Sequence, residues 1–93
     1  MDRIQAMQMF MRVAEAGSFV RAAETLSLPA STVTSTIKNL EKYLKVRLLN
    51  RTTRRVSLTP EGMQYLAQCR EILALIEHSE SSLSESVARP QGR

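Results

Sequence analysis

Residues 18–44, SFVRAAETLSLPASTVTSTIKNLEKYL, predict two helices joined by a tight turn. Ser18 can cap the first helix, because a serine hydroxyl accepts a hydrogen bond from an unpaired amide of the first turn. The adjacent Ala22 and Ala23 would let a second helix cross close by, as a compact helix-turn-helix requires. Pro29 suits the first turn of the second helix, where its missing N–H would be unpaired anyway. The stretch therefore predicts a helix-turn-helix.

The second predicted helix, residues 30–44, has an apolar face and a polar face. Val33, Ile37, Leu40 and Leu44 recur at helical spacing and predict a stripe that packs in a core. The opposite face carries small hydroxyl groups first and lysines later: Ser31, Ser35, Lys38 and Lys42, with Thr34 on its flank. Such a face suits the major groove of DNA, with its N-terminal end at base edges and its later turns near phosphate. Taken alone, the helix could equally present an ordinary solvated surface.

Charge is concentrated in one part of the chain. The 93 residues carry a net charge of +4, but residues 38–55 hold seven Lys and Arg side chains and one Glu, a net charge of +6. The remainder of the chain therefore sums to −2. A cationic block beside a helix-turn-helix is typical of a surface that binds a polyanion.

The flanking segments complete a winged fold. Residues 3–16 predict a first helix, closed by Gly17, that packs on the other two to form a three-helix core. Val56 and Leu58 alternate with polar residues and predict a short strand, with residues 48–51 as its partner. A two-stranded hairpin after a recognition helix is a wing, and its turn, about residues 50–55, is basic. We expect it to project the guanidinium groups of Arg51, Arg54 and Arg55 toward phosphate or a narrow minor groove.

A long helix follows the wing. Thr59 can cap it, Pro60 fits its first position, and neither Pro nor Gly interrupts the chain between Gly62 and Pro90. A heptad-like apolar seam runs along this helix: Leu66, Cys69, Leu73, Ile76 and Leu83. This is more apolar surface than the small domain can cover, so we expect a homodimer. The alternative is a helix that folds back on its own domain.

Other functional classes find little support. One cysteine and one histidine supply no disulfide framework and no metal site, and no catalytic set or glycine-rich phosphate loop is visible. No signal peptide and no apolar run of roughly 20 residues is seen, which favours a cytoplasmic protein without a membrane span. Residues 89–93 resemble a hinge, which suggests a piece of a longer protein.

About residues 4–88 resemble the N-terminal region of LysR-type transcriptional regulators. The matching positions are Gly17-Ser18-Phe19, Ala22-Ala23, Leu26, Val33, Ile37, Leu40-Glu41, Leu44, Leu48-Leu49, Arg51, Arg54, Val56, Leu58-Thr59 and Gly62. The resemblance implies a mainly α fold: a winged helix-turn-helix (1–58), a linker and dimerisation helix (59–88) and a hinge (89–93). It also implies a dimer, or a tetramer of dimers, on a dyad operator, and a small-molecule effector that binds a C-terminal domain absent from this sequence. No cofactor is implied for these residues.

The resemblance carries over to the DNA-contacting positions only in part. Family members often have Gln-Pro where this chain has Ala30-Ser31, and Ser-Arg where it has Thr34-Ser35. The expected base contacts are therefore Ala30, Ser31, Thr34 and Ser35, without the Gln and Arg that make bidentate contacts. Arg54 matches the wing arginine of the minor groove, and Arg51, Thr52 and Arg55 match positions near the backbone. Lys38 and Lys42 are assigned to phosphate on helix geometry. We hypothesise that base readout depends more on the wing and on DNA shape than is usual.

Two functions from different classes remain. The leading one is sequence-specific binding of double-stranded DNA by a bacterial regulator. The alternative is a dimeric winged-helix protein-interaction module, which the long helix would also fit. The basic block and the hydroxyl-lined face argue against it, because a protein interface more often exposes apolar or aromatic residues.

Overall fold

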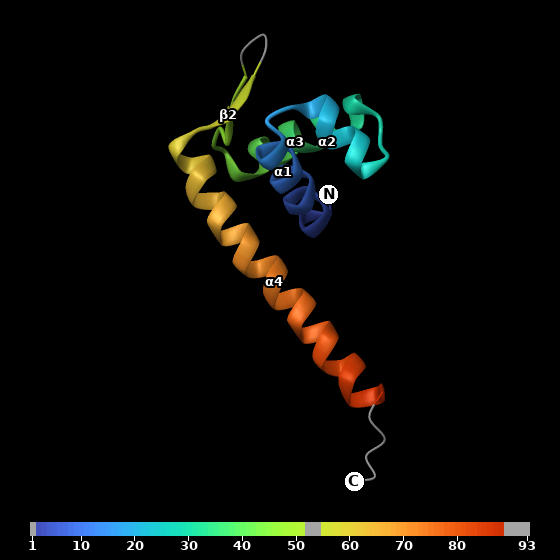
Figure 1. Cartoon of the computed structure of the whole chain (residues 1–93). Coiled ribbons are helices and arrows are strands. Elements are labelled where there is room, and N and C mark those ends of the chain that lie inside the picture. Colours follow the sequence, from blue (N-terminus) through green and yellow to red (C-terminus); the bar gives the residue numbers. More distant parts are fainter. Residues whose placement is uncertain (1, 52–54, 89–93) are drawn as a thin grey trace.

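The computed structural model describes residues 2–51 and 55–88. Its elements follow in the order α1 (Arg3–Ala16), α2 (Phe19–Leu26), α3 (Ala30–Leu44), β1 (Leu49–Arg51), β2 (Val56–Leu58) and α4 (Pro60–Ala88). Figure 1 shows α1, α2 and α3 gathered into one head, with the hairpin at one end of it and α4 running along it and beyond it. The predicted mainly α architecture of a three-helix core, a two-stranded wing and a long final helix is confirmed.

Short polar contacts fix where the first helices begin and end. The Asp2 side chain caps α1 by accepting the Gln5 N–H at 3.1 Å, and Ser18 caps α2 by accepting the Arg21 N–H at 3.2 Å. Gly17 ends α1 with φ at +69°, a left-handed conformation that a residue without Cβ adopts most easily. Helix α3 begins at Ala30 as predicted, but Pro29 differs from the prediction that placed it in the first turn of this helix. Pro29 is the extended residue before α3 and not a member of its first turn, because a proline readily takes this extended conformation ahead of a helix.

The core has α1 at its centre. Phe10 and Val13 of α1 are fully buried among the second and third helices, which is possible because Ala22 and Ala23 keep α2 close. The predicted stripe of α3 is buried too, at Val33, Ile37, Leu40 and half-buried Leu44. Leu48 and Leu49 close the core from the wing side, and Leu66 and Cys69 close it from α4. The head therefore has one continuous apolar interior, to which the first turns of α4 belong.

The wing is a short antiparallel ladder. Leu49 pairs with Leu58, Asn50 with Ser57 and Arg51 with Val56. Leu49 is buried and Leu58 is half-buried, so this pair anchors the base of the hairpin to the head. Residues 52–54 are outside the described residues.

A cluster of hydrogen bonds joins the wing to α4. The Thr59 hydroxyl donates to the Arg47 carbonyl at 2.6 Å and accepts the Gly62 N–H at 2.9 Å, so it caps α4 as predicted. At ~1.5 Å per residue, the 29 residues of α4 extend about 43 Å. The second half of the helix runs past the head (Figure 1). Among the described helices, none combines the length and apolarity that a membrane crossing needs.

Candidate nucleic-acid interface

The outward face of α3 carries the predicted polar side chains in one row. Ser31, Ser35, Lys38 and Lys42 are exposed, while Ala30 and Thr34 are half-buried at the edge of the same face. These side chains face outward because Val33, Ile37 and Leu40, on the opposite face of the helix, are buried in the core. Thr36, which is close by, donates its hydroxyl to the Thr32 carbonyl at 2.9 Å and is engaged within the helix. The structure therefore brings the candidate base-contacting and phosphate-contacting residues of α3 together.

Cations continue from α3 toward the wing. Lys45 and Arg47 are exposed in the segment that connects α3 to β1, and Arg55 is exposed immediately before the returning strand. With Lys38 and Lys42, they make the segment from the second half of α3 to the start of the wing rich in exposed positive charge. Thr52 and Arg54, which the sequence assigned to the backbone and the minor groove, are outside the described residues.

Arg51 differs from the prediction for the wing arginines. Its Nη2 lies 3.1 Å from Oε1 of Glu41, and the guanidinium carbon lies 5.3 Å from the centroid of the Phe19 ring. The prediction that this guanidinium projects from the hairpin is wrong, because its charge is paired inside the same chain. Only 24% of the Arg51 side chain and 11% of the Glu41 side chain are exposed.

Glu41 is a residue whose role the sequence did not reveal. Beyond the Arg51 contact, its Oε2 accepts the Leu48 N–H at 2.9 Å and the Leu49 N–H at 3.1 Å. The carboxylate thus satisfies two backbone donors and one guanidinium at the place where α3, the connecting segment and β1 meet. One signal could have pointed to it, since Glu41 is the single acidic residue of the basic block 38–55.

The predicted dimer seam on α4 needs correction at its start. Cys69 is 0% exposed and Leu66 is buried as well, both against the core of their own chain. Neither side chain is available to a partner, because the first turns of α4 pack on the head. Leu73 and Ile76 are half-buried, and the large apolar side chains exposed on the described part of α4 are Met63, Ile72, Leu75 and Leu83. The first part of the seam therefore serves the fold of one chain.

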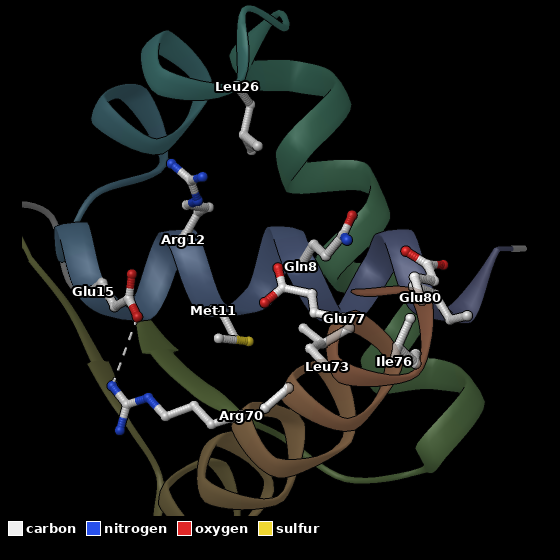
Figure 2. A pocket seen from close by; sticks show the side chains of 12 residues that line it. Gln8, Met11, Arg12, Glu15, Leu26, Arg70, Leu73, Ile76, Glu77 and Glu80 are labelled. Carbon is white, nitrogen blue, oxygen red and sulfur yellow. Dashed lines mark ion pairs between the residues drawn. The ribbon is translucent and has the colours of Figure 1, made fainter. Parts of the chain in front are cut away.

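An open groove of about 630 Å³ lies between α1 and α4, with Leu26 of α2 at one end. Figure 2 shows Met11, Leu73 and Ile76 in this groove, with charged side chains around them. The Arg70 guanidinium reaches across it to the Glu15 carboxylate at 3.8 Å. The groove is thus apolar within and charged at its edges.

The contact between α1 and the start of α4 contains two titratable groups. The Tyr65 ring lies 5.6 Å from the Phe10 ring, centroid to centroid, at an interplanar angle of 44°. Burial, together with the neighbouring Cys69, raises the pKa of Tyr65 to about 12. Burial also raises the pKa of the Cys69 thiol. Both groups are therefore neutral at physiological pH and act as packing residues. Within the described residues, no cluster of His, Cys, Asp and Glu could hold a metal ion.

Comparison with known proteins identifies the family. The family model for bacterial regulatory helix-turn-helix proteins of the lysR family matches residues 4–63. An HTH-type transcriptional repressor of Pseudomonas aeruginosa is 47% identical over 93 residues, which cover 100% of this chain and 29% of that protein. The chain therefore spans about three-tenths of the length of this curated relative.

Solved structures agree with this assignment. The CbnR DBD–DNA complex matches with a TM-score of 0.85 and 35% identity, covering 92% of this chain and 98% of that one. The complex of the BenM DBD with benA site 1 DNA matches with a TM-score of 0.85 and 29% identity, covering 88% of this chain and 95% of that one. The family match over most of the head and the close agreement in fold lead to one conclusion: the chain belongs to the lysR family of bacterial regulatory helix-turn-helix proteins.

Proposed function

We propose that this chain is the sequence-specific, double-stranded DNA-binding part of a LysR-type transcriptional regulator. In this proposal α3 enters the major groove and the wing meets the minor groove or the adjacent backbone. The proposal is supported by relatives that are transcriptional regulators and by structural neighbours solved as DNA complexes. The role is regulatory and not enzymatic, and the compartment is the cytoplasm.

One observation carries the proposal: the outward face of α3 is polar at its start and cationic behind. Ala30, Ser31, Thr34 and Ser35 would meet base edges, because the N-terminal end of a recognition helix is the part that reaches into the groove. Lys38 and Lys42 lie one to two turns later, where phosphate contacts are expected. Hydroxyl groups discriminate between bases less sharply than Arg or Gln side chains do. We therefore expect the wing, through the shape of the minor groove, to contribute a larger share of the sequence specificity.

The wing side of the interface is basic. Arg55 is exposed immediately before β2, and Arg54 and Thr52 precede it in the sequence. Arginines suit a narrow minor groove because its negative potential is enhanced there. We assign Arg54 to the minor groove, and Thr52 and Arg55 to the nearby backbone.

A second copy of the chain is the partner we propose for α4. Leu75 and Leu83 are 65% and 68% exposed, and Ile72 is exposed on the same side of the helix. Half-buried Leu73 and Ile76 line the α1–α4 groove beside them (Figure 2). An α4 from another copy would cover both the outward side chains and the groove. Single exposed leucines are normal on a protein surface, but an apolar patch that continues into a groove marks an interaction site. The resulting dimer would match the two halves of a dyad operator.

The remaining functions belong to the longer protein. We propose an effector-binding part that follows residue 88 or thereabouts and responds to a small molecule, because the relatives are about three times as long as this chain. Residues 89–93 would connect the two parts. Assembly of dimers into a tetramer would also depend on the longer protein.

The test is a binding selection on random duplexes, performed at several salt concentrations with this chain at a concentration that forms dimers. Enrichment of a dyad whose half-sites are about one helical turn or more apart is the expected result. Salt-sensitive binding without enrichment would leave a sequence-independent DNA-coating function. If no duplex bound at low salt, DNA binding would be refuted, and a dimeric winged-helix module for protein interaction would take its place.

A further inference from the structure

The Glu41 carboxylate connects α3 to the residue before β1 and to β1 itself through three hydrogen bonds to its two oxygens. Oε2 accepts the backbone N–H groups of Leu48 and Leu49, and Oε1 pairs with Arg51 Nη2 at 3.1 Å. The donors lie seven, eight and ten residues further along the chain. A single side chain of α3 therefore fixes the path of the backbone into β1.

Arg51 extends this connection to a third element. Its guanidinium lies over the ring of Phe19, the first residue of α2, at 5.3 Å from the ring centroid. Its Nε atom is buried and has no hydrogen-bond partner among the described residues. A planar guanidinium can stack on a ring and pair with a carboxylate at the same time, which an ammonium group does poorly. The side chain is built into the junction of α2, α3 and β1.

The position of Arg51 makes this junction the base of the wing. Arg51 is the last residue of β1, and it pairs with Val56, the first residue of β2. Lys38 and Lys42, the candidate phosphate contacts of α3, lie three residues before and one residue after Glu41. The Glu41–Arg51 ion pair therefore joins α3, which carries the candidate major-groove contacts, to β1, which leads into the wing.

We propose that Glu41 and Arg51 are positioning residues that set the angle of the wing to α3, so that Arg51 acts through Glu41 and not by contact with a DNA phosphate. This inference rests on the proposed function, since it concerns how the wing reaches the minor groove. With the pair intact, the wing and α3 meet neighbouring grooves at the same time. Without it, the hairpin keeps its ladder, the buried Leu48 and Leu49 and the hydrogen bonds of Thr59. It loses the charged connection to α3, so its angle to that helix is no longer fixed and its contacts with DNA weaken.

The variant Glu41→Gln distinguishes a positioning role of Arg51 from a direct contact between Arg51 and a DNA phosphate. Gln keeps an oxygen for the Leu48 and Leu49 amides but removes the charge that pairs with Arg51. If Arg51 contacted phosphate, Glu41→Gln would release the guanidinium and remove a negative charge near DNA, and binding would tighten. The positioning role predicts weaker binding, and it predicts that Arg51→Met has the same effect.

The measurement compares two duplexes that share the enriched half-sites and differ only under the wing, with A·T pairs in one and G·C pairs in the other. The wild-type dimer should prefer the A·T duplex, because the wing arginines favour a narrow minor groove. Each single variant should reduce that preference by about tenfold, with the base preferences under α3 unchanged. Glu41→Gln/Arg51→Met should be no worse than either single variant, because both act on one pair. Glu24→Gln removes an exposed carboxylate of α2 and should leave the preference intact.

The double variant also protects the test against misfolding, because it leaves no buried charge unpaired. Circular dichroism and thermal melting of each variant establish which of them are folded. Tighter binding by Glu41→Gln would overturn the inference. So would a folded double variant that keeps the A·T preference while its salt slope falls by about one per protomer. If the wild-type chain bound no duplex at low salt, the proposed function itself would fail, a result distinct from both.

Discussion

Gly62 of α4 lies directly against the carbonyl oxygen of Leu48, at the entrance to the wing. A Cβ atom at residue 62 would collide with that oxygen and would press on the Leu58 side chain at 3.2 Å. The same carbonyl accepts the Thr59 N–H at 3.0 Å, so it cannot move aside without breaking the joint between wing and helix. Glycine is required here by the space available, although the residue is helical.

Gly62→Ala should therefore destabilise the protein. In an ordinary helix position, alanine would stabilise by roughly 0.5–1 kcal/mol relative to glycine. Here we expect a loss of about 1–3 kcal/mol, the usual range for overpacking. Urea denaturation at fixed protein concentration measures the difference. Ala67→Gly, at an exposed position of the same helix, is the control that reports the ordinary propensity effect. A variant at residue 62 as stable as the wild type would contradict the close approach to Leu48.

Lys45→Gly should stabilise the protein. Lys45 ends α3 with φ at +60°, a left-handed conformation that costs a residue with Cβ about 1–2 kcal/mol. Glycine loses more entropy on folding, so we expect a net gain of about 0.5–1 kcal/mol. Ser27 ends α2 with φ at +57° and carries no charge. Ser27→Gly relieves the same backbone conformation without removing a positive charge, so it shows how much of the effect of Lys45→Gly comes from the backbone. Melting temperatures that rise for both variants would support the explanation, and a fall in both would refute it.

Leu75→Glu should weaken the dimer while leaving the head folded. Leu75 is 65% exposed in the single chain, so the substitution removes no contact from its own core. Burying a leucine at an interface contributes about 1.5–3 kcal/mol, and a dimer contains two copies. Sedimentation equilibrium should show at least a tenfold rise in the dissociation constant, with helix content unchanged. Ala67→Glu adds the same charge at another exposed position of α4 and should leave the dimer intact. Equal behaviour of the two variants would argue against the α4 interface.

Thr34→Ala and Lys38→Ala should affect DNA binding in different ways. Thr34 lies near the start of the outward face of α3, so its loss should change the preferred sequence more than the nonspecific affinity. Lys38 should act at phosphate, so its loss should weaken binding to all sequences and reduce the salt slope by about one per protomer. Arg3→Ala removes an exposed cation of α1 that lies outside both the α1–α4 groove and the outward face of α3, and it is the control for net charge. If Lys38→Ala changed the preferred sequence and Thr34→Ala did not, the assignment of Thr34 to bases and Lys38 to phosphate would be wrong.

Stability should fall in alkaline solution because of Tyr65. Burial raises the pKa of Tyr65 in the folded chain to about 12, against 10.0 for an ordinary tyrosine. Between these two pH values the unfolded chain has lost the proton and the folded chain has kept it, so rising pH favours unfolding. Below pH 10 both states are protonated and Tyr65 adds no pH dependence. Burial raises the pKa of Cys69 too, so its thiol acts in the same direction.

The check is denaturant unfolding of the wild type and of Tyr65→Phe at a series of pH values from 8 upward. The phenylalanine variant should lose less stability above pH 10 than the wild type. Ultraviolet titration of the folded wild type should show one tyrosine that ionises at about pH 12. Identical alkaline profiles for the two proteins would contradict a buried Tyr65.

The sequence predicts the local structure of this chain well. Ser18 and Gly17 mark helix ends by their own chemistry, and the spacing of Val33, Ile37 and Leu40 defines the inner face of α3. These signals are short-range, so they can be read without knowing the fold. They also place the row of Ser31, Ser35, Lys38 and Lys42 on the outer face, which is the candidate base and phosphate surface.

Contacts between distant residues were not predictable in the same way. Arg51 lies beside the wing turn in sequence, but its charge is paired with a carboxylate ten residues earlier. Heptad spacing shows that Leu66 and Cys69 are apolar positions of one face. It cannot tell whether the chain's own head or a second copy covers them, because that depends on where α1 lies. The DNA contacts of the individual side chains remain predictions.

The burial of Cys69 fixes how α4 can change in length. Its first turns are held in the core of the head, while Leu75 and Leu83 lie beyond it on the same continuous helix. One residue inserted between Cys69 and Leu75 would turn everything after it by about 100° and carry Leu83 away from any partner that it faced. Seven inserted residues would turn it by only about 20° and lengthen the helix by about 10 Å. Homologues that space their two heads differently should therefore differ in this helix by sevens, not by ones.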